Sequence, residues 1–315
     1  MSVSDALSVL APAKINLLLH VGPVQADGYH PLVSLAAFAD VGDRVTVRRA
    51  EALSLTVEGP FAAGLDGQGD NLILKALRAL GEAAGIGEPP VAVTLDKRLP
   101  IAAGLGGGSA DAGAALRLTA RLLDLDMPAA ELERLALAAG ADGPMCLRAR
   151  PAWASGIGEV LEDEPRLPTL HGVLLNPGLP SPTGGVYRAY DAAPVGAADR
   201  PASPADWSSA AVIAWLAAQR NDLEAPAQAV TPGIEEALAA MRAAPACRLT
   251  RMSGSGATVF GLFDDRAAAI EAASGMRIIS SITPGMKEGS TRGRPMPSMR
   301  EPLAVVAMSP LCQAS

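Results

Sequence analysis

Apolar residues in the first third of the chain alternate with other residues in four short segments. Every second position is apolar in residues 15–21, 45–47, 53–57 and 91–95. A period of two is typical of strands that bury one face, so these segments predict half-buried β-strands.

Two segments show helical periodicity instead. In residues 70–85, four apolar residues fall on one helical face, Asp70 or Asn71 can cap the start, and Gly85 can end the helix. Residues 128–139 predict a second helix, which begins with proline and ends before Gly140. Because several strands precede the helices in runs, we predict an α+β fold in preference to a doubly wound parallel sheet.

The second half predicts a smaller α+β domain. A strand at 172–176 leads into a Pro- and Gly-rich stretch at 177–185, which indicates a functional loop or a domain joint near residue 165. Helical patterns follow around 207–220 and 233–243, and strand patterns at 248–252 and 257–263. We therefore expect an N-terminal domain over residues 1–164 and a C-terminal domain over residues 165–275.

The last forty residues differ from the rest of the chain. From Met276 onward the sequence holds five of the ten methionines, several Pro, Ser and Gly, and no sustained period. This composition predicts a poorly ordered or loosely docked tail over residues 276–315. The tail is either a genuine extension or the product of a shifted reading frame.

Composition and charge narrow the class of protein. Apolar residues make up 49% of the 315 residues and charged residues 19%, which excludes a disordered chain or a coiled coil. The net charge of −7, without a basic cluster ahead of the tail, argues against nucleic acid as a partner. No apolar run reaches the roughly 18–20 residues of a membrane span, and the N-terminus lacks the charged region of a signal peptide. Three scattered cysteines without metal or redox spacing favour a cytoplasmic location.

The strongest chemical signal is a glycine-rich stretch at residues 99–113. A predicted strand enters it and an amphipathic helix leaves it. Consecutive glycines let backbone amides turn toward an anion, and the helix adds its free N–H groups and the positive end of its dipole. The P-loop and dinucleotide motifs are absent. The stretch therefore predicts a phosphate-binding loop of another kind, in preference to a plain turn.

Asp111, in the first turn of that helix, raises a question of charge. A carboxylate suits a helix N-terminus but repels a bound phosphate unless a cation lies between them. A Mg²⁺ ion held by the phosphates, with help from Ser109, would resolve the conflict. An ordinary first-turn acid is the equal alternative.

Three motifs in order resemble the GHMP kinases, the family of galactokinase and of homoserine, mevalonate and phosphomevalonate kinases. Residues 100–110 (PIAAGLGGGSA) resemble the ATP-binding motif, residues 11–17 (APAKINL) the first motif, and residues 252–260 (MSGSGATVF) the third. The resemblance covers residues 9 to about 265. It implies a two-domain α+β kinase fold with the active site in the cleft between the domains.

Four further segments match one branch of this family. They are residues 26–30 (ADGYH), 97–100 (KRLP), 140–144 (GADGP) and 221–224 (NDLE). The resemblance implies an ATP-dependent kinase that phosphorylates the 2-hydroxyl of a cytidine diphosphate alcohol in the non-mevalonate route to isoprenoids. Another small-molecule kinase of the family, for homoserine or a sugar, and a non-catalytic nucleotide-binding relative are the alternatives.

The resemblance also implies the catalytic residues. Asp142 would orient the substrate hydroxyl and accept its proton, while Lys14 keeps that carboxylate ionised and offsets charge on the transferring phosphoryl group. A loose phosphoryl-transfer transition state requires mainly alignment and charge stabilisation, so a weak base suffices. Without the resemblance, Asp142 would be read as a helix N-cap before Pro144, and Lys14 as a strand-edge lysine in solvent.

The same resemblance assigns binding residues. Contacts to ATP, which would carry Mg²⁺, are implied for the loop residues and two others, with Ser109 as the one candidate metal ligand. The ATP-binding set is Pro100, Ile101, Ala102, Ala103, Gly104, Leu105, Gly106, Gly107, Gly108, Ser109, Ala110, Asn71 and Lys97. The substrate-binding set is Asn16, Tyr29, His30, Tyr187, Gly254 and Ser255.

Three of these residues would bind the cytosine. Tyr29 and His30 match positions that hold the base, and Tyr187 would enclose it from a second side. Stacking on aromatic rings is worth roughly 1–3 kcal/mol per base. Without the resemblance, a Tyr-His pair in a loop would be read as a packing pair.

The sequence departs from the family at two places. Related chains close the second domain with a helix and a short final strand after a position like Met276, and residues 278–287 do not match that pattern. Met145 and Cys146 stand where bulkier residues are common near the substrate cleft. The partner is expected to be a small molecule, and the sequence leaves the oligomeric state open.

Overall fold

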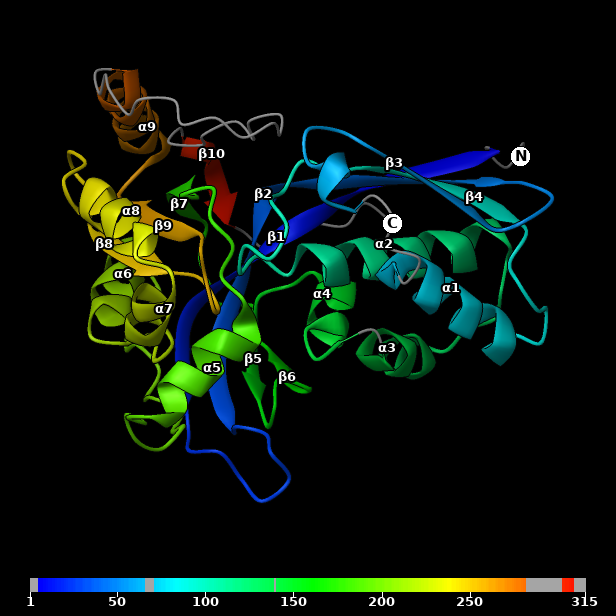
Figure 1. Cartoon of the computed structure of the whole chain (residues 1–315), viewed down its shortest axis with the longest axis horizontal. Coiled ribbons are helices and arrows are strands. Elements are labelled where there is room, and N and C mark those ends of the chain that lie inside the picture. The colour runs from blue at the N-terminus through cyan, green and yellow to red at the C-terminus, as the bar shows by residue number, and fades with distance from the viewer. Residues whose placement is uncertain (1–4, 66–70, 139, 282–301, 309–315) are drawn as a thin grey trace, which may run out of the picture.

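The computed structural model describes residues 5–65, 71–138, 140–281 and 302–308 (Figure 1). The N-terminal half contains β1 (Ala6–Val21), β2 (Leu32–Arg49), β3 (Ser54–Glu58), the 3₁₀ helix η1 (Ala62–Leu65), α1 (Leu72–Ala83), β4 (Val91–Asp96), α2 (Gly107–Leu122), α3 (Ala129–Ala138), α4 (Gly143–Arg148), β5 (Ala152–Ser155) and β6 (Val160–Asp163). The C-terminal half contains β7 (Leu170–Leu175), α5 (Thr183–Asp191), α6 (Ser209–Ala217), α7 (Glu224–Val230), α8 (Gly233–Arg242), β8 (Leu249–Met252), β9 (Val259–Phe263), α9 (Arg266–Ser281) and β10 (Pro302–Met308).

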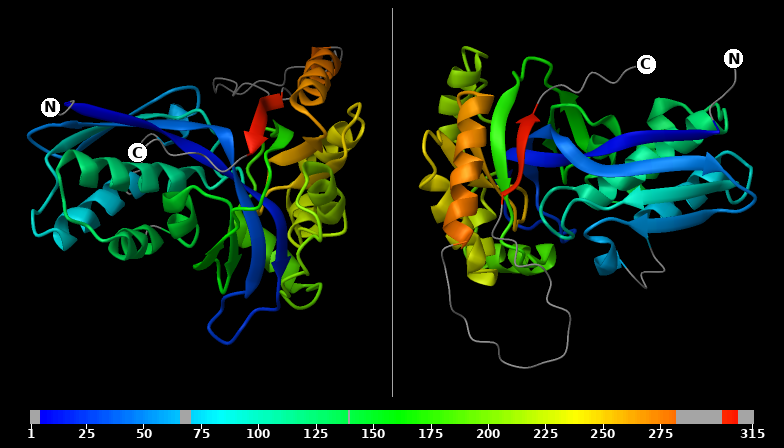
Figure 2. Two further views of the ribbon diagram at one scale, coloured as in Figure 1. Left: turned by 180° about the vertical axis from the view of Figure 1, so that it is seen from behind. Right: turned by 90° about the horizontal axis from the view of Figure 1, so that it is seen from above.

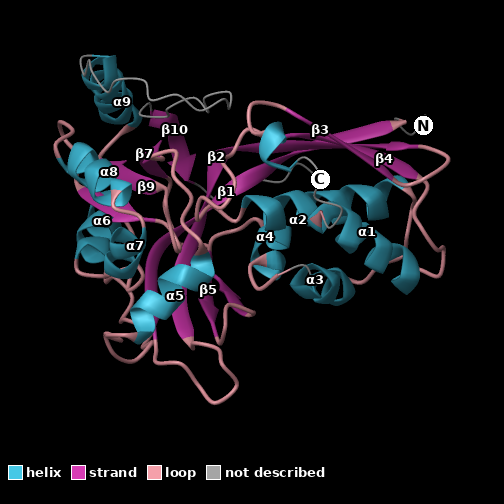
Figure 3. Cartoon of the chain, in the orientation of Figure 1, coloured by secondary structure: helices cyan, strands magenta, loops and turns pink. Residues whose placement is uncertain are grey.

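The two longest strands organise the N-terminal half. β1 and β2 pair antiparallel from Ala6 opposite Arg48 to Val21 opposite Leu32. β4 pairs antiparallel with the end of β2, and β3 joins β4 in parallel. Helices α1 to α4 cover one face of this sheet (Figure 3). Apolar side chains that are fully or almost fully buried, such as Leu77, Val93 and Leu116, form the core between the two layers.

The C-terminal half is a four-stranded antiparallel sheet with helices on both faces. β7 lies between β9 and β10, and β8 pairs with β9. Helices α7 to α9 pack on the face of Val173 and Val259, and α6 packs on the opposite face with Leu174 and Phe260. These four helices lie at the other end of the molecule from α1 to α3 (Figure 2). One pair, Met308 opposite Ala39, connects β10 to β2. Seven of the ten described strands therefore form a continuous sheet in the order β3-β4-β2-β10-β7-β9-β8, while β1 and β5 pair with β2 and β6 pairs with β5.

The elements with clear periodicity are confirmed. The helix predicted at 70–85 is α1, capped by Asn71 and followed by Gly85 at φ +69°. The helix predicted at 128–139 is α3, and the predicted strands at 15–21, 53–57 and 91–95 lie in β1, β3 and β4. The short strand at 45–47 belongs to the 18-residue β2. The β5–β6 hairpin and helices α4, α5, α7 and α9 were not predicted.

The structure differs from the expected tail in two places. α9 runs to Ser281, past the expected boundary at residue 275, and residues 302–308 form β10 between β2 and β7. Val306 and Met308 are fully buried there. This short apolar run is held as a strand by its pairing with β2 and β7. A run this brief carries no periodicity of its own. Residues 282–301 and 309–315 of the expected tail lie outside the described residues.

Candidate active site

A cleft of about 490 Å³ lies where the two halves of the chain meet. It is bordered by β1, the loop before α2, the starts of α4 and α5, and the turn between β8 and β9. The predicted residues that line it are Lys14, Asn16, Lys97, Pro100, Ile101, Ala102, Ala103, Gly104, Leu105, Gly106, Gly107, Gly108, Ser109, Asp142, Tyr187, Gly254 and Ser255. The predicted residues outside this lining are Tyr29, His30, Asn71 and Ala110.

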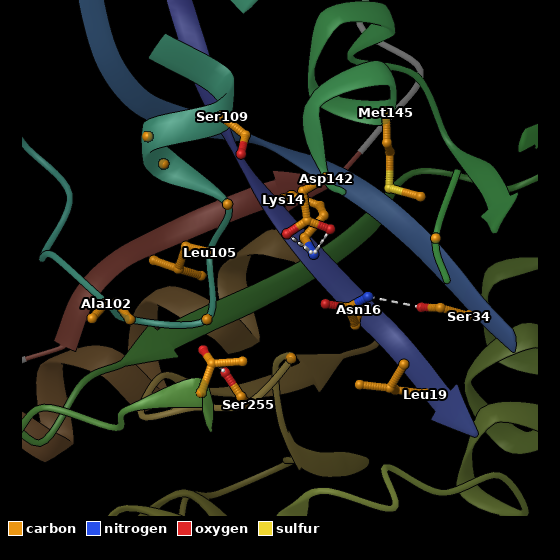
Figure 4. Close-up of a pocket in the computed structure, with 18 of the residues that line it drawn as sticks. Lys14, Asn16, Leu19, Ser34, Ala102, Leu105, Ser109, Asp142, Met145 and Ser255 are labelled. Atoms are coloured by element: carbon orange, nitrogen blue, oxygen red, sulfur yellow. Dashed lines mark hydrogen bonds and ion pairs between the residues drawn. The ribbon is translucent and has the colours of Figure 1, made fainter. Parts of the chain in front are cut away.

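An ion pair between Lys14 and Asp142 lies in the middle of the cleft. The Lys14 Nζ atom is 2.9 Å from both carboxylate oxygens of Asp142. The Lys14 side chain is only 6% exposed, whereas that of Asp142 is 44% exposed. Figure 4 shows the pair between Ser109 and Ser255. A strand-edge lysine in solvent is therefore excluded, and the exposed carboxylate remains within reach of a ligand.

The backbone before α4 explains how Asp142 reaches this place. Asp142 occupies the N-cap position of α4, but its side chain makes no capping hydrogen bond. Gly143 allows the close approach, because a Cβ there would lie 1.9 Å from the carbonyl oxygen of Ala136. The helix start therefore positions the carboxylate, and the carboxylate bonds Lys14 instead of the helix.

The glycine-rich loop has the backbone that its sequence predicts. Gly104 and Gly106 have φ values of +73° and +63°, and α2 begins directly after Gly106. The loop carbonyls of Ala103 and Leu105 accept hydrogen bonds from Thr258 N and Lys14 N. In the described part of the chain, no hydrogen bond is formed by the amides of Gly107, Gly108 and Ser109, as expected for the first turn of a helix. These groups can bind phosphate.

Lys97 lies beneath this loop in a buried cluster of charges. Its Nζ atom is 2.5 Å from Asp43 Oδ2 and 2.9 Å from Asp111 Oδ2, and the three side chains are at most 4% exposed. Burial by itself would lower the pKa of Lys97, but Asp111 and Asp43 outweigh it and raise that pKa. Burial raises the pKa of Asp111 to about 7, although Lys97 opposes the shift.

This cluster corrects both interpretations of Asp111. Asp111 is the fifth residue of α2 and lies past the first turn of the helix. The cation beside its carboxylate is the ammonium group of Lys97, and the side chain is buried. The sequence could not show this, because Asp43, Lys97 and Asp111 come from three different segments. The predicted contact of Lys97 with ATP stays a prediction.

Two predicted ATP-binding side chains serve the fold in this structure. The Asn71 Oδ1 atom accepts a hydrogen bond of 2.9 Å from Ile73 N and caps α1. Ala110 is 1% exposed and packs in the N-terminal core. Neither side chain lines the cleft, so any contact with ATP would involve other atoms or another conformation.

The aromatic residues are only partly brought together. Tyr187, on α5, lines the cleft, and the His30 ring lies 4.8 Å from it between centroids. His30 Nε2 is 2.7 Å from Asp191 Oδ1. Tyr29 is 57% exposed on the β1–β2 connection, so the two tyrosines do not enclose a space in this structure. Burial raises the pKa of Tyr187 to about 12, which keeps its hydroxyl protonated at neutral pH.

Hydroxyl and amide groups complete the cleft. The Asn16 backbone N–H donates to Ser253 Oγ, and the Ser253 hydroxyl donates to the carbonyl oxygen of Gly104. Ser255 Oγ lies 2.9 Å from Thr183 Oγ1. Thr183 and Ser34 also line the cleft, and neither was predicted. Thr183 lies in the Pro- and Gly-rich stretch expected to be functional, whereas Ser34 gives no signal in the sequence.

In the described ranges, no group of three or more His, Cys, Asp or Glu side chains could hold a metal ion. Nor does any helix there have the length and apolarity to cross a membrane.

Comparisons with known proteins agree with the fold. The family described as GHMP kinases N terminal domain matches residues 71–149, and the family described as GHMP kinases C terminal matches residues 210–279. A protein of Caulobacter vibrioides (strain NA1000 / CB15N) named 4-diphosphocytidyl-2-C-methyl-D-erythritol kinase is 53% identical over 259 residues, which cover 81% of this chain and 89% of the relative. A protein of the same name from Paramagnetospirillum magneticum is 48% identical, covering 85% of this chain and 93% of the relative.

Solved structures extend the comparison. A crystal structure of 4-(cytidine 5'-diphospho)-2C-methyl-D-erythritol kinase matches with a TM-score of 0.75 and 33% identity, covering 96% of this chain and 100% of the other. Homoserine kinase from Cytophaga hutchinsonii matches with a TM-score of 0.62 at 20% identity, covering 90% of this chain and 94% of the other, and shows only the shared fold. The predicted α+β GHMP kinase fold is confirmed.

Proposed function

The chain belongs to the 4-diphosphocytidyl-2-C-methyl-D-erythritol kinase family of GHMP kinases, and from this we propose that it transfers the γ-phosphoryl group of ATP to the 2-hydroxyl of 4-(cytidine 5'-diphospho)-2-C-methyl-D-erythritol. The observation that carries the proposal is the pair of Lys14 and Asp142, which shares one cleft with the glycine-rich loop. The cleft thus combines a phosphate-binding backbone with a carboxylate that can receive a hydroxyl proton.

The chemistry follows from this arrangement. The substrate hydroxyl donates a hydrogen bond to Asp142, its oxygen attacks the γ-phosphorus, the bond to the β-γ bridging oxygen breaks, and ADP leaves. The proton passes to the Asp142 carboxylate. Lys14 holds that carboxylate in one orientation and offsets negative charge on the transferring group. In a loose transition state, alignment and charge stabilisation supply most of the rate enhancement.

The two ends of the cleft would hold the two nucleotides. The amides of Gly107, Gly108 and Ser109 and the dipole of α2 bind the ATP phosphates. Tyr187 and His30 bind the cytosine, and Tyr29 would have to move to cover it. Mg²⁺ bound to the phosphates would neutralise part of their charge, and the Ser109 hydroxyl is an oxygen donor of the kind that it prefers.

We extend the proposal to the organisation of the chain. Residues 1–164 and 165–275, with the end of α9 and β10 added to the second, act as two domains that meet at the cleft. The protein works in the cytoplasm on small molecules, without nucleic acid or membrane partners. The separate family matches in the two halves support this division.

The direct test is ADP release by the purified protein with Mg-ATP and one of three alcohols. We expect turnover with 4-(cytidine 5'-diphospho)-2-C-methyl-D-erythritol and none with homoserine or mevalonate. Turnover with another alcohol instead would support a kinase activity but contradict the assignment of the cytosine-binding residues. A folded protein without activity on any of the three would reject the proposed function.

A further inference from the structure

The Asn16 side-chain amide lies in the cleft, and its nitrogen and oxygen atoms differ in their hydrogen bonding. Its Nδ2 atom donates a hydrogen bond of 2.8 Å to Ser34 Oγ. Its Oδ1 atom is buried and has no hydrogen-bond partner in the described part of the chain. Figure 4 shows the nitrogen turned toward Ser34 and the oxygen turned away from it. A buried acceptor of this kind normally has a partner, so a bound ligand is expected to supply the donor.

The orientation of this amide follows from the polarity of the hydrogen bonds around Ser34. Ser34 Oγ is 2.7 Å from the carbonyl oxygen of Leu18, which can only accept, so the single hydroxyl proton of Ser34 is used there. The Ser34 oxygen can then only accept from Asn16. Only the NH₂ end of the Asn16 amide can therefore face Ser34.

We propose that Ser34 is a positioning residue that holds the Asn16 amide with its oxygen toward the ligand, so that Asn16 accepts a hydrogen bond from a hydroxyl of the alcohol substrate. The inference rests on the proposed function, because it assumes an alcohol in this cleft. Asp142 engages the hydroxyl that is phosphorylated, so Asn16 binds a neighbouring hydroxyl of the same molecule.

The surroundings of Asn16 agree with this assignment. Asn16 follows Lys14 by two positions on β1, which places alternate side chains on one face, and both residues line the cleft. Gly254 lies beside the amide oxygen, and a Cβ at that position would crowd it at 3.3 Å from Asn16 Oδ1. Ser34 is 1% exposed and is held by the same two hydrogen bonds, so its geometry is fixed before a ligand binds.

The test compares Ser34→Ala with Ser34→Thr, which keeps the hydroxyl. We expect Ser34→Ala to raise the KM for 4-(cytidine 5'-diphospho)-2-C-methyl-D-erythritol about tenfold, as for the loss of one oriented hydrogen bond, and to leave the KM for ATP within about twofold. Ser34→Thr should recover most of the affinity. Thermal unfolding confirms that each variant is folded. Equal increases of both KM values would indicate a merely structural role and overturn the inference.

Substrate analogues make the test specific for hydroxyl recognition. The 1-deoxy and 3-deoxy analogues each lack one hydroxyl next to the reacting one. Wild type should lose affinity with one of them, and Ser34→Ala should lose much less. If wild type and Ser34→Ala discriminate equally against both analogues, the inference is wrong.

Calorimetric binding separates this inference from the proposed function. Wild-type protein that binds the cytidine compound without turning it over would reject the kinase activity, while the comparison of the variants by affinity would still decide the role of Ser34. Protein that does not bind the compound at all would reject both.

Discussion

Lys14 and Asp142 are 128 positions apart in the sequence, yet they form the ion pair on which the proposed chemistry depends. We expect Asp142→Asn to lower kcat by about 10²- to 10⁴-fold, because an amide cannot accept the hydroxyl proton. The KM for ATP should change little, since the loop proposed to bind the ATP phosphates is intact. Steady-state kinetics with both substrates varied would measure this.

Asp163→Asn is a matched control for that variant. The Asp163 side chain is also 44% exposed and also pairs with a basic residue, Arg148, but it lies on β6 outside the cleft lining. Its kcat should equal that of wild type. If Asp142→Asn turned over substrate at the wild-type rate, Asp142 would not be the proton acceptor.

Asp111 gives a second prediction at the scale of single residues, and here the readout is stability. Its pKa is raised from 3.8 to about 7 in the folded protein, mainly by burial. The folded state therefore binds this proton more tightly than the unfolded state. The stability associated with it is fully present below about pH 4 and is lost as the pH rises through about 7.

Asp111→Asn keeps an oxygen that can accept from Lys97 but cannot ionise. We expect the melting temperature of this variant, relative to wild type, to increase between pH 5 and pH 8. Asp43 and Lys97, the charged groups that face Asp111, are unchanged in the comparison. Parallel melting curves over the whole pH range would contradict the raised pKa of Asp111.

At the scale of an element, the loop that leads into α2 depends on the backbone conformation of one residue, Gly104. Gly104 has a φ of +73°, and a Cβ there would lie 2.3 Å from the Ser253 carbonyl oxygen. Gly104→Ala should therefore displace the loop and raise the KM for ATP at least tenfold. The matched control is Gly85→Ala, because Gly85 has a φ of +69° but no atom within 4 Å of the added Cβ. That variant should lose only about 1 kcal/mol of stability and keep its kinetics. Equal effects of the two variants on the KM for ATP would contradict this role of the loop.

Elements could be predicted where the pattern is local. α1 and α3 combine an apolar face with local start and stop signals, and the glycine-rich loop carries its own motif. β2 is continuously apolar or small over much of its length because it is buried on both faces, so only its alternating end was predicted. α5 starts inside a Pro- and Gly-rich stretch and is defined by its packing. The hydrogen bonds from Lys97 to Asp43 and Asp111, and from Asn16 to Ser34, could not be predicted from the sequence either. Each joins residues from different segments that meet only in the folded chain.

At the scale of the whole molecule, one sheet connects the two halves and carries the cleft at their junction. A cluster of buried residues packs β1 and the glycine-rich loop against β9 and β10, with Ile15, Leu105, Phe260 and Val306 among its members. Strand β1, which carries Lys14 and Asn16, and the last described strand therefore share one core.

Val306 tests whether β10 belongs to the folded core. It is fully buried opposite Gly172 of β7, so Val306→Ala should lower the free energy of unfolding by about 2 kcal/mol, the sum of lost burial and a small cavity. Val160→Ala makes the same chemical change on β6, where the side chain is 57% exposed, and should shift stability by less than about 0.5 kcal/mol. Urea denaturation of the three proteins measures the difference. Turnover well below the unfolding transition should be unchanged in both variants, because neither residue lines the cleft. A Val306→Ala protein as stable as the control would mean that β10 is not packed into this sheet in solution.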